Sequence, residues 1–252
     1  MTHLEKEIQR LKNEKYAGVE TADFVRDVER LTQGEPYEYV LGHTPFLGAH
    51  IDLSQRPMIP RYETAFWVER AIEELEEKQK KLSRPLRLAD TFSGAGNVAL
   101  ALLTHLRDAH VDISELDPNL KKQIEISLEK NHIDASRATV ITASHIQGLT
   151  GKYDAILAVP PYVPYEALPN LDPEMINFEP HLAFFAHNDG HEFHDILIEQ
   201  AYDLLEEGGT LYMETDMDHG DWIRERVKGT KWSALEFWPD PYGAEPNVVL
   251  RK

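Results

Sequence analysis

The sequence predicts an α/β protein with a largely parallel β-sheet and helices on both of its faces. From about residue 85 onward, short apolar runs that fit strands alternate with longer amphipathic runs that fit helices. The first of these strands ends in an acidic residue and enters the next helix through a glycine-rich turn, in ADTFSGAGNVAL (89–100). Open α/β sheets with such a turn bind ligands at the carboxyl edge of the sheet.

Composition limits the class of protein. The chain has 252 residues, 42% of them hydrophobic, which suits one ordinary α/β domain with an appendage or two small domains. There is no cysteine, which excludes disulfides, thiol nucleophiles and cysteine zinc sites and fits a cytoplasmic location. No run approaches the roughly 18 apolar residues of a membrane helix. The charged segment MTHLEKEIQRLKNEK lacks the apolar core of a secretory signal.

The charge balance indicates what the protein binds. A formal net charge of −18 disfavours phosphate backbones and anionic surfaces as ligands. We therefore expect no duplex nucleic acid and no membrane as partner. A protein or a small molecule is the better expectation, and we expect the chain to be a monomer.

The first third of the chain is expected to be a helical region followed by a linker. Apolar residues recur at helical spacing up to about residue 33, and Gly34, Pro36 and Gly42 then mark a turn. The expected segments are a helical hairpin over 1–33, a turn and short element over 33–42, a strand over 45–54, a loop over 58–64 ending at a capping Thr64, and an amphipathic helix over 65–82.

The remaining segments alternate between strand and helix. Strands are expected over 86–92, 109–117, 138–144, 153–159 and 210–216, helices over 93–106, 119–133, 190–209 and 219–229, and a terminal hairpin over 233–252. We therefore divide the chain into a short N-terminal helical region (1–33), a linker hairpin with its helix (34–83) and an α/β domain (84–252).

The glycine turn is the first candidate binding feature. Gly94 and Gly96 permit a tight turn and a close approach of the backbone to a ligand, although a plain strand-to-helix turn explains some such sequences. The next strand ends in Glu115, and a carboxylate at that place suits the two hydroxyls of a ribose. Asp117 competes with Glu115 for this role.

The second feature is the loop AVPPYVP, after the strand over 153–159. This loop lies at the same sheet edge as the glycine turn. Pro160 and Pro161 form a stiff wall with carbonyl acceptors and no N–H donors. Tyr162 offers a flat face to a planar amide or base.

Together, the glycine turn, the acid and the Pro-Pro-Tyr loop resemble class I S-adenosylmethionine-dependent methyltransferases that modify amino groups, whose signature is Asn-Pro-Pro-Tyr. Five further segments resemble the HemK/PrmC-type release-factor glutamine methyltransferases: GEPYEYVLG, FLGAHIDLSQRPMIPRYETAFWVE, FEPHLAFFAHNDG, LLEEGGTLYMETD and PDPYGAEPNVVL. The resemblance covers about residues 33 to 250. It implies a Rossmann-like, seven-stranded methyltransferase sheet, a linker hairpin and an N-terminal helical part shorter than the family's five-helix domain.

The resemblance also implies S-adenosylmethionine as cofactor. Phe92 stands where the usual motif has its first glycine, so its φ has to remain negative to avoid strain. His145 stands where the family usually has an acid near the adenine. The residues that the resemblance assigns to the cofactor are Asp90, Thr91, Phe92, Ser93, Gly94, Gly96, Asn97, Glu115, Leu116, His145 and Val159.

The largest departure is in the catalytic motif, where Val159 replaces the family's Asn. The resemblance assigns catalysis to Val159, Pro160, Pro161 and Tyr162, and substrate binding to Arg61 and Pro160–Tyr162. Valine has no acceptor for the substrate amide. Losing one oriented contact lowers a rate on the order of 10²–10³-fold. An unpaired buried N–H costs roughly 1–3 kcal/mol.

Three functions therefore stay open. The first is methylation of a glutamine side-chain amide in a peptide chain release factor, by direct transfer from the cofactor. The second is a catalytically weak or inactive binding protein with this fold. The third is N-methylation of another amino acceptor. We expect no metal site, because HEFH, with nearby His187, is one residue short of the HExxH zinc motif.

Overall fold

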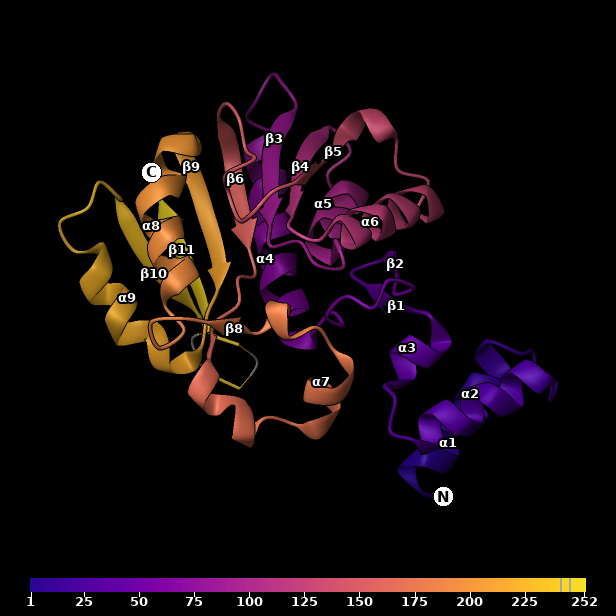
Figure 1. Cartoon of the computed structure of the whole chain (residues 1–252). Coiled ribbons are helices and arrows are strands. Elements are labelled where there is room, and N and C mark those ends of the chain that lie inside the picture. Colours follow the sequence, from indigo (N-terminus) through magenta and orange to yellow (C-terminus); the bar gives the residue numbers. More distant parts are fainter. Residues whose placement is uncertain (241, 245) are drawn as a thin grey trace.

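A seven-stranded sheet forms the centre of the computed structural model, which describes residues 1–240, 242–244 and 246–252 (Figure 1). The strand order is β10-β11-β9-β6-β3-β4-β5. The neighbours from β9 to β5 are parallel, whereas β11 is antiparallel to both β9 and β10. This confirms the predicted α/β fold. The bounds are β3 Leu86–Thr91, β4 Ala109–Glu115, β5 Ala138–Thr142, β6 Tyr153–Ala158, β9 Leu205–Glu214, β10 Ala234–Trp238 and β11 Asn247–Arg251.

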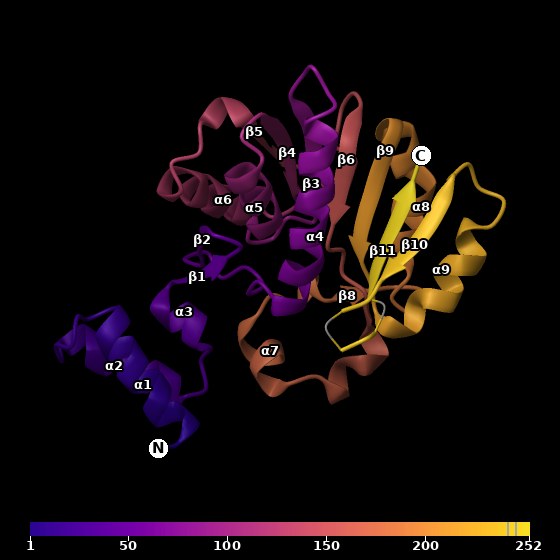
Figure 2. The same ribbon diagram turned by 180° about the vertical axis from the view of Figure 1, so that it is seen from behind.

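Helices cover both faces of this sheet. They are α4 Tyr62–Gln79, α5 Asn97–His105, α6 Pro118–Lys130, α8 Glu192–Leu204 and α9 Gly220–Val227. Side chains alternate between the faces along a strand. Leu86 and Leu88 therefore join the core under α4, α5 and α6, and Ala89 joins the core under α8 and α9. Figure 2 shows α4 in front of β3, and Figure 1 shows α8 on the opposite face.

The N-terminal helices have a small core of their own. As predicted, residues 1–33 form a helical hairpin, α1 (His3–Glu14) and α2 (Ala22–Thr32), which α3 (Tyr37–Leu41) follows. Figure 1 shows this unit projecting away from the sheet. Its buried apolar residues are Leu11, Phe24, Leu31, Tyr37, Val40 and Leu41.

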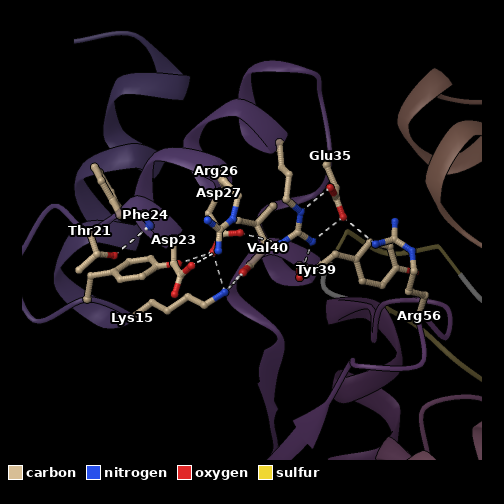
Figure 3. A network of polar contacts seen from close by, with 12 residues as sticks. Lys15, Thr21, Asp23, Phe24, Arg26, Asp27, Glu35, Tyr39, Val40 and Arg56 are labelled. Carbon is tan, nitrogen blue, oxygen red and sulfur yellow. Dashed lines mark hydrogen bonds and ion pairs between the residues drawn. The ribbon is translucent and has the colours of Figure 1, made fainter.

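A network of charged side chains joins this helical unit to the linker (Figure 3). Arg30 of α2 donates two hydrogen bonds to Glu35, at 2.8 and 2.7 Å. Arg56, beyond the linker hairpin, donates to the same carboxylate at 2.6 Å. Lys15 contacts Asp27 at 2.7 Å within the helical hairpin. Glu35 thus connects α2 with the segment that leads to α4.

Two expectations for the linker are wrong. The strand expected over 45–54 is a hairpin of β1 (His43–Phe46) and β2 (Ala49–Asp52). Leu47 and Gly48, with φ of 44° and 83°, form its two-residue turn. The second error concerns α4, which begins at Tyr62, so Thr64 lies inside the helix rather than capping it.

The segment between β6 and α8 was not assigned from the sequence. Its elements are β7 Val163–Pro164, η2 Tyr165–Asn170, α7 Pro173–Phe178, η3 His181–Ala183 and β8 Phe185–Ala186. The helix expected over 190–209 ends at Leu204, because the chain enters β9 at Leu205. Short turns η1 (Ala135–Arg137) and η4 (Met217–His219) precede β5 and α9. Pro241 and Glu245 of the terminal hairpin lie outside the described residues. Among the described residues, no helix has the length and apolarity to cross a membrane.

Candidate functional site

A cavity opens at the carboxyl edge of β3, β4 and β6, where the two predicted loops meet. It is bounded by the glycine turn, the end of β4, the loop after β5, the Pro-Pro loop and the start of α4. The predicted site residues that line it are Arg61, Asp90, Phe92, Ser93, Gly94, Asn97, Glu115, Leu116, His145, Val159 and Pro161. Four other predicted site residues are not part of this lining: Thr91, Gly96, Pro160 and Tyr162.

Asp90, at the end of β3, holds the glycine turn in place. Its buried carboxylate accepts a hydrogen bond from the N–H of Ala99 in α5, at 3.0 Å. Ser93 Oγ donates to the carbonyls of Asp90 and Ser114, at 3.0 and 3.1 Å. Burial raises the pKa of Asp90 to about 7. The residue therefore supports the shape of the turn as well as facing the cavity.

Glu115 joins the glycine turn to β4. Its carboxylate accepts hydrogen bonds from the N–H groups of Gly94 at 2.7 Å and Asp117 at 2.8 Å. Burial raises its pKa. Asp117 is used differently, since its side chain caps α6 by accepting from Asn119 N–H at 2.8 Å. Both acids line the cavity, but Glu115 is the one that also contacts the turn.

The two glycines of the turn have different structural roles. A Cβ on Gly94, whose φ is 50°, would meet no atom within 4 Å. A Cβ on Gly96, whose φ is 76°, would lie 2.8 Å from Ile124 Cγ1 in α6. Gly96 therefore permits close packing of α5 and α6, and only Gly94 lies on the cavity surface.

An aromatic wall occupies one side of the cavity. The expectation of a negative φ at Phe92 is wrong, because its φ is 60° and the residue is in the left-handed region. The Phe92 ring packs edge-on against Phe193, with centroids 5.1 Å apart, and stacks near His145 at 6.4 Å. Burial lowers the pKa of His145, which favours the neutral ring. Sequence reasoning missed Phe193, because only the packing of α8 brings it to this edge.

Val159 and Pro161 form another part of the cavity lining. Half-buried Val159 and buried Pro161 line the cavity, and Pro160 is buried between them. The side chain at position 159 therefore presents methyl groups to the place where the resemblance implies a hydrogen-bond acceptor.

Tyr162 is anchored from behind. Its hydroxyl donates to Glu214 Oε1 at 3.1 Å. The other carboxylate oxygen of Glu214 accepts from Thr64 Oγ1 at 2.6 Å and Trp67 Nε1 at 2.9 Å. Gly190, with φ of 85°, packs on the same loop, since a Cβ there would lie 2.1 Å from the carbonyl oxygen of Tyr162.

Arg61 is held beside the cavity by Glu179, which the sequence analysis did not single out. The buried Glu179 carboxylate accepts from Arg61 at 2.5 Å and from Ile59 N–H at 2.8 Å. Its only sequence signal is its place in the segment FEPH. The ion pair fixes the linker segment that forms one wall of the cavity.

The histidines near α8 pack with one another. The ring of His191 lies 4.2 Å from the rings of both His219 and Trp222. His194 is buried, contacts the Glu214 carbonyl at 2.8 Å, and has its pKa lowered to about 4 by burial. Among the described residues, no group of three or more His, Cys, Asp or Glu side chains is placed to hold a metal ion.

Comparison with known proteins assigns the family. No family model matches the sequence. The release factor glutamine methyltransferase of Bradyrhizobium diazoefficiens is 32% identical over 200 residues, covering 77% of this chain and 65% of that protein. The protein of the same name from Moorella thermoacetica is 30% identical over 216 residues, covering 85% of this chain and 74% of that protein. The chain belongs to the release factor glutamine methyltransferase family.

Solved structures place this family member among methyltransferase folds. The hMettl16 catalytic domain, solved with a MAT2A 3′UTR hairpin, matches with a TM-score of 0.61 at 16% identity, over 81% of this chain and 75% of that chain. A methyltransferase from Pyrococcus furiosus matches with a TM-score of 0.51 at 19% identity, over 72% of this chain and 82% of that chain. A SAM-dependent O-methyltransferase from Thermotoga maritima matches with a TM-score of 0.52 at 15% identity, over 79% of this chain and 68% of that chain. At these identities the likeness shows the Rossmann-like fold.

Proposed function

We propose that this family member binds S-adenosylmethionine and acts on a glutamine side-chain amide of a peptide chain release factor. The observation that carries the proposal is the cavity, which has the Glu115 carboxylate and Gly94 on one side and Val159 and Pro161 on the other. Two such walls suit a nucleoside-containing cofactor facing a planar acceptor. The cofactor supplies an electrophilic methyl group when bound.

The residues present fit this cofactor. The Glu115 carboxylate can accept hydrogen bonds from ribose hydroxyls, and the open surface of Gly94 admits close approach of a ligand. Phe92, Phe193 and neutral His145 offer aromatic surface to an adenine. We propose that Asp90, Ser93 and Asn97, which line the cavity, hold the methionine part. We propose these as the cofactor contacts, with Thr91 and Gly96 supporting them from behind.

The acceptor side rests on the loop after β6. Pro160 and Pro161 exclude water and carry carbonyl acceptors, and Tyr162 stiffens the loop through its hydroxyl. Arg61, fixed by Glu179, lies at the linker wall, where it can contact an incoming polypeptide. Because Val159 offers no acceptor, the amide nitrogen is held by fewer hydrogen bonds and we propose slow transfer.

A second candidate is a binding protein with little or no turnover. Val159, which has no hydrogen-bond acceptor, favours this candidate. Phe92 and His145 favour it as well, because they stand where the family usually has a glycine and an acid. Methylation of another amino acceptor is a third candidate. The net charge of −18 argues against duplex nucleic acid as the substrate that carries this amino group.

Two measurements test the proposal. Calorimetry with S-adenosylmethionine is expected to show binding, and no heat at millimolar cofactor contradicts both transferase candidates. Incubation with a purified release factor and methyl-labelled cofactor is expected to label one glutamine slowly. Binding without any labelling, even at enzyme concentrations equal to substrate, selects the binding-protein candidate.

A further inference from the structure

Glu214, the last residue of β9, lies where three elements meet beside the cavity. Glu214 is 4% exposed to solvent. Its carboxylate accepts hydrogen bonds from Thr64 and Trp67 of α4 and from Tyr162 of the loop after β6. The three donors are two hydroxyls and an indole N–H, all neutral. Thr64 itself lines the cavity.

A carboxylate in this place needs an explanation beyond packing. Burying a charged group away from water is unfavourable, and replacing it with an apolar residue of similar size often stabilises a protein. Converging hydrogen bonds to one carboxylate instead fix the positions of the side chains that donate them. Here those side chains belong to α4 and to the loop after β6, and both of these elements contribute other residues or the donor itself to the cavity lining.

Tyr162 is held at two points, one at each end of the residue. The hydroxyl contacts Glu214, and the backbone carbonyl packs against Gly190, where no Cβ has room. Because Tyr162 directly follows Pro160 and Pro161 in the chain, the contact between its hydroxyl and Glu214 also restrains these two prolines. Through Thr64, the same carboxylate reaches the start of α4, three residues after Arg61.

We propose that Glu214 is a positioning residue that joins the start of α4 to the Pro160–Tyr162 loop and so sets the geometry of the acceptor wall. The test of this proposal by enzyme activity rests on the proposed function, whereas the test by the ionisation of Tyr162 does not. Glu214 is not among the residues that line the cavity, so its carboxylate acts through Tyr162 and Thr64.

The structural readout is the ionisation of Tyr162. With tyrosine labelled at Cζ and Tyr162→Phe to identify its resonance, the Tyr162 phenol is expected to ionise only at strongly alkaline pH. Burial and the Glu214 charge raise its pKa well above the usual value. In Glu214→Gln the charge is lost, and the ionisation midpoint is expected to fall by about one pH unit or more. An unchanged midpoint overturns the proposal, whether or not the protein methylates anything.

The activity readout separates positioning from stability. Glu214→Leu removes all three hydrogen bonds, and kcat/KM for the release factor is expected to fall on the order of 100-fold, with the Kd for S-adenosylmethionine changed less than about threefold. Glu214→Gln keeps the geometry, because its carbonyl accepts from Thr64 and Trp67 and its amide donates to Tyr162. It is expected to retain kcat/KM to within about fivefold.

Glu74 provides a matched control, because this α4 acid also accepts a hydrogen bond from a β9 tyrosine, Tyr212, at 2.8 Å. Glu74→Leu is expected to lower Tm without lowering kcat/KM. Equal losses of kcat/KM in Glu74→Leu and Glu214→Leu overturn the positioning role. If wild type labels no release factor, the proposed function fails, and the Tyr162 midpoint still decides the role of Glu214.

Discussion

At the residue scale, the site combines supporting side chains with one conspicuous substitution. Asp90 and Glu115 hold the glycine turn through backbone N–H groups, so their positions follow from the fold itself. Val159 lines the cavity without a hydrogen-bonding group. Two predictions separate these roles, one on rate and one on stability.

Replacing Val159 with Asn is expected to raise kcat/KM for a release factor on the order of 10²–10³-fold, because it restores an oriented acceptor for the amide nitrogen. Asn is close to Val in volume, so the cavity wall is retained. Transfer of a labelled methyl group measures the change. Val159→Ala is the control, since it alters the wall without adding an acceptor. An equal gain in both variants shows that the missing acceptor is not the reason for slow transfer.

The raised pKa of Asp90 predicts that the free energy of unfolding depends on pH. Its pKa rises from an ordinary 3.8 to about 7 in the folded protein. Between these values the unfolded chain releases a proton that the folded chain keeps, so this contribution to stability is full below about pH 4 and is lost as pH rises through 7. The free energy of unfolding of wild type relative to Asp90→Asn is expected to fall by about 2–4 kcal/mol across this window. Urea unfolding at several pH values measures it, and a flat or rising difference contradicts the assignment.

At the element scale, the loops rather than the strands define the cavity. The turn at Asp189 and Gly190, which precedes α8, packs onto the loop after β6, and α8 carries Phe193 to the aromatic wall. The parallel strands bring these loops to one edge because each strand enters the sheet in the same direction.

Gly190→Ala is expected to destabilise the protein by about 2–4 kcal/mol, since the new methyl group meets the Tyr162 carbonyl in a left-handed backbone. Gly208→Ala is the matched control, because its φ of 71° is also left-handed but a Cβ there would meet no atom within 4 Å. It is expected to lose only about 1–2 kcal/mol. Thermal and urea unfolding compare the two, and similar losses would show that the loop contact is unimportant.

At the scale of the whole molecule, we propose three units: the helical region (1–33), the linker with α4 (34–83) and the α/β domain (84–252). The small core of the helices extends across the first boundary, because it includes Tyr37, Val40 and Leu41 of α3. The carboxylate of Glu35 adds a polar connection between the first two units to this shared apolar core. The proposals of a monomer and of a protein partner belong to this scale as well.

Glu35→Ala is expected to loosen the helical region while leaving the cavity intact, because Arg30 and Arg56 both lose their contacts with the Glu35 carboxylate and Arg30 keeps Asp27 as its carboxylate partner. Amide hydrogens of α1 and α2 are expected to exchange about tenfold faster, with the Kd for S-adenosylmethionine unchanged. Glu20→Ala, which removes an exposed ion pair with Lys12 on the same hairpin, is the control. Equal exchange in the two variants would refute a special role for Glu35.

The sequence by itself determined the α/β alternation, most element positions, the cavity-lining residues of the glycine turn and the substitution at Val159. These depend on local periodicity and on motifs a few residues long, which a linear sequence contains. The sequence misplaced the start of α4, predicted one strand where the structure has the β1–β2 hairpin, and predicted no element between β6 and α8. Only the tertiary structure brought Phe193, Glu179 and Glu214 to the site, because their partners lie far away along the chain. For Glu214 and Thr64 the separation is 150 residues. Such contacts arise from the packing of helices on the sheet, and packing has no local signature.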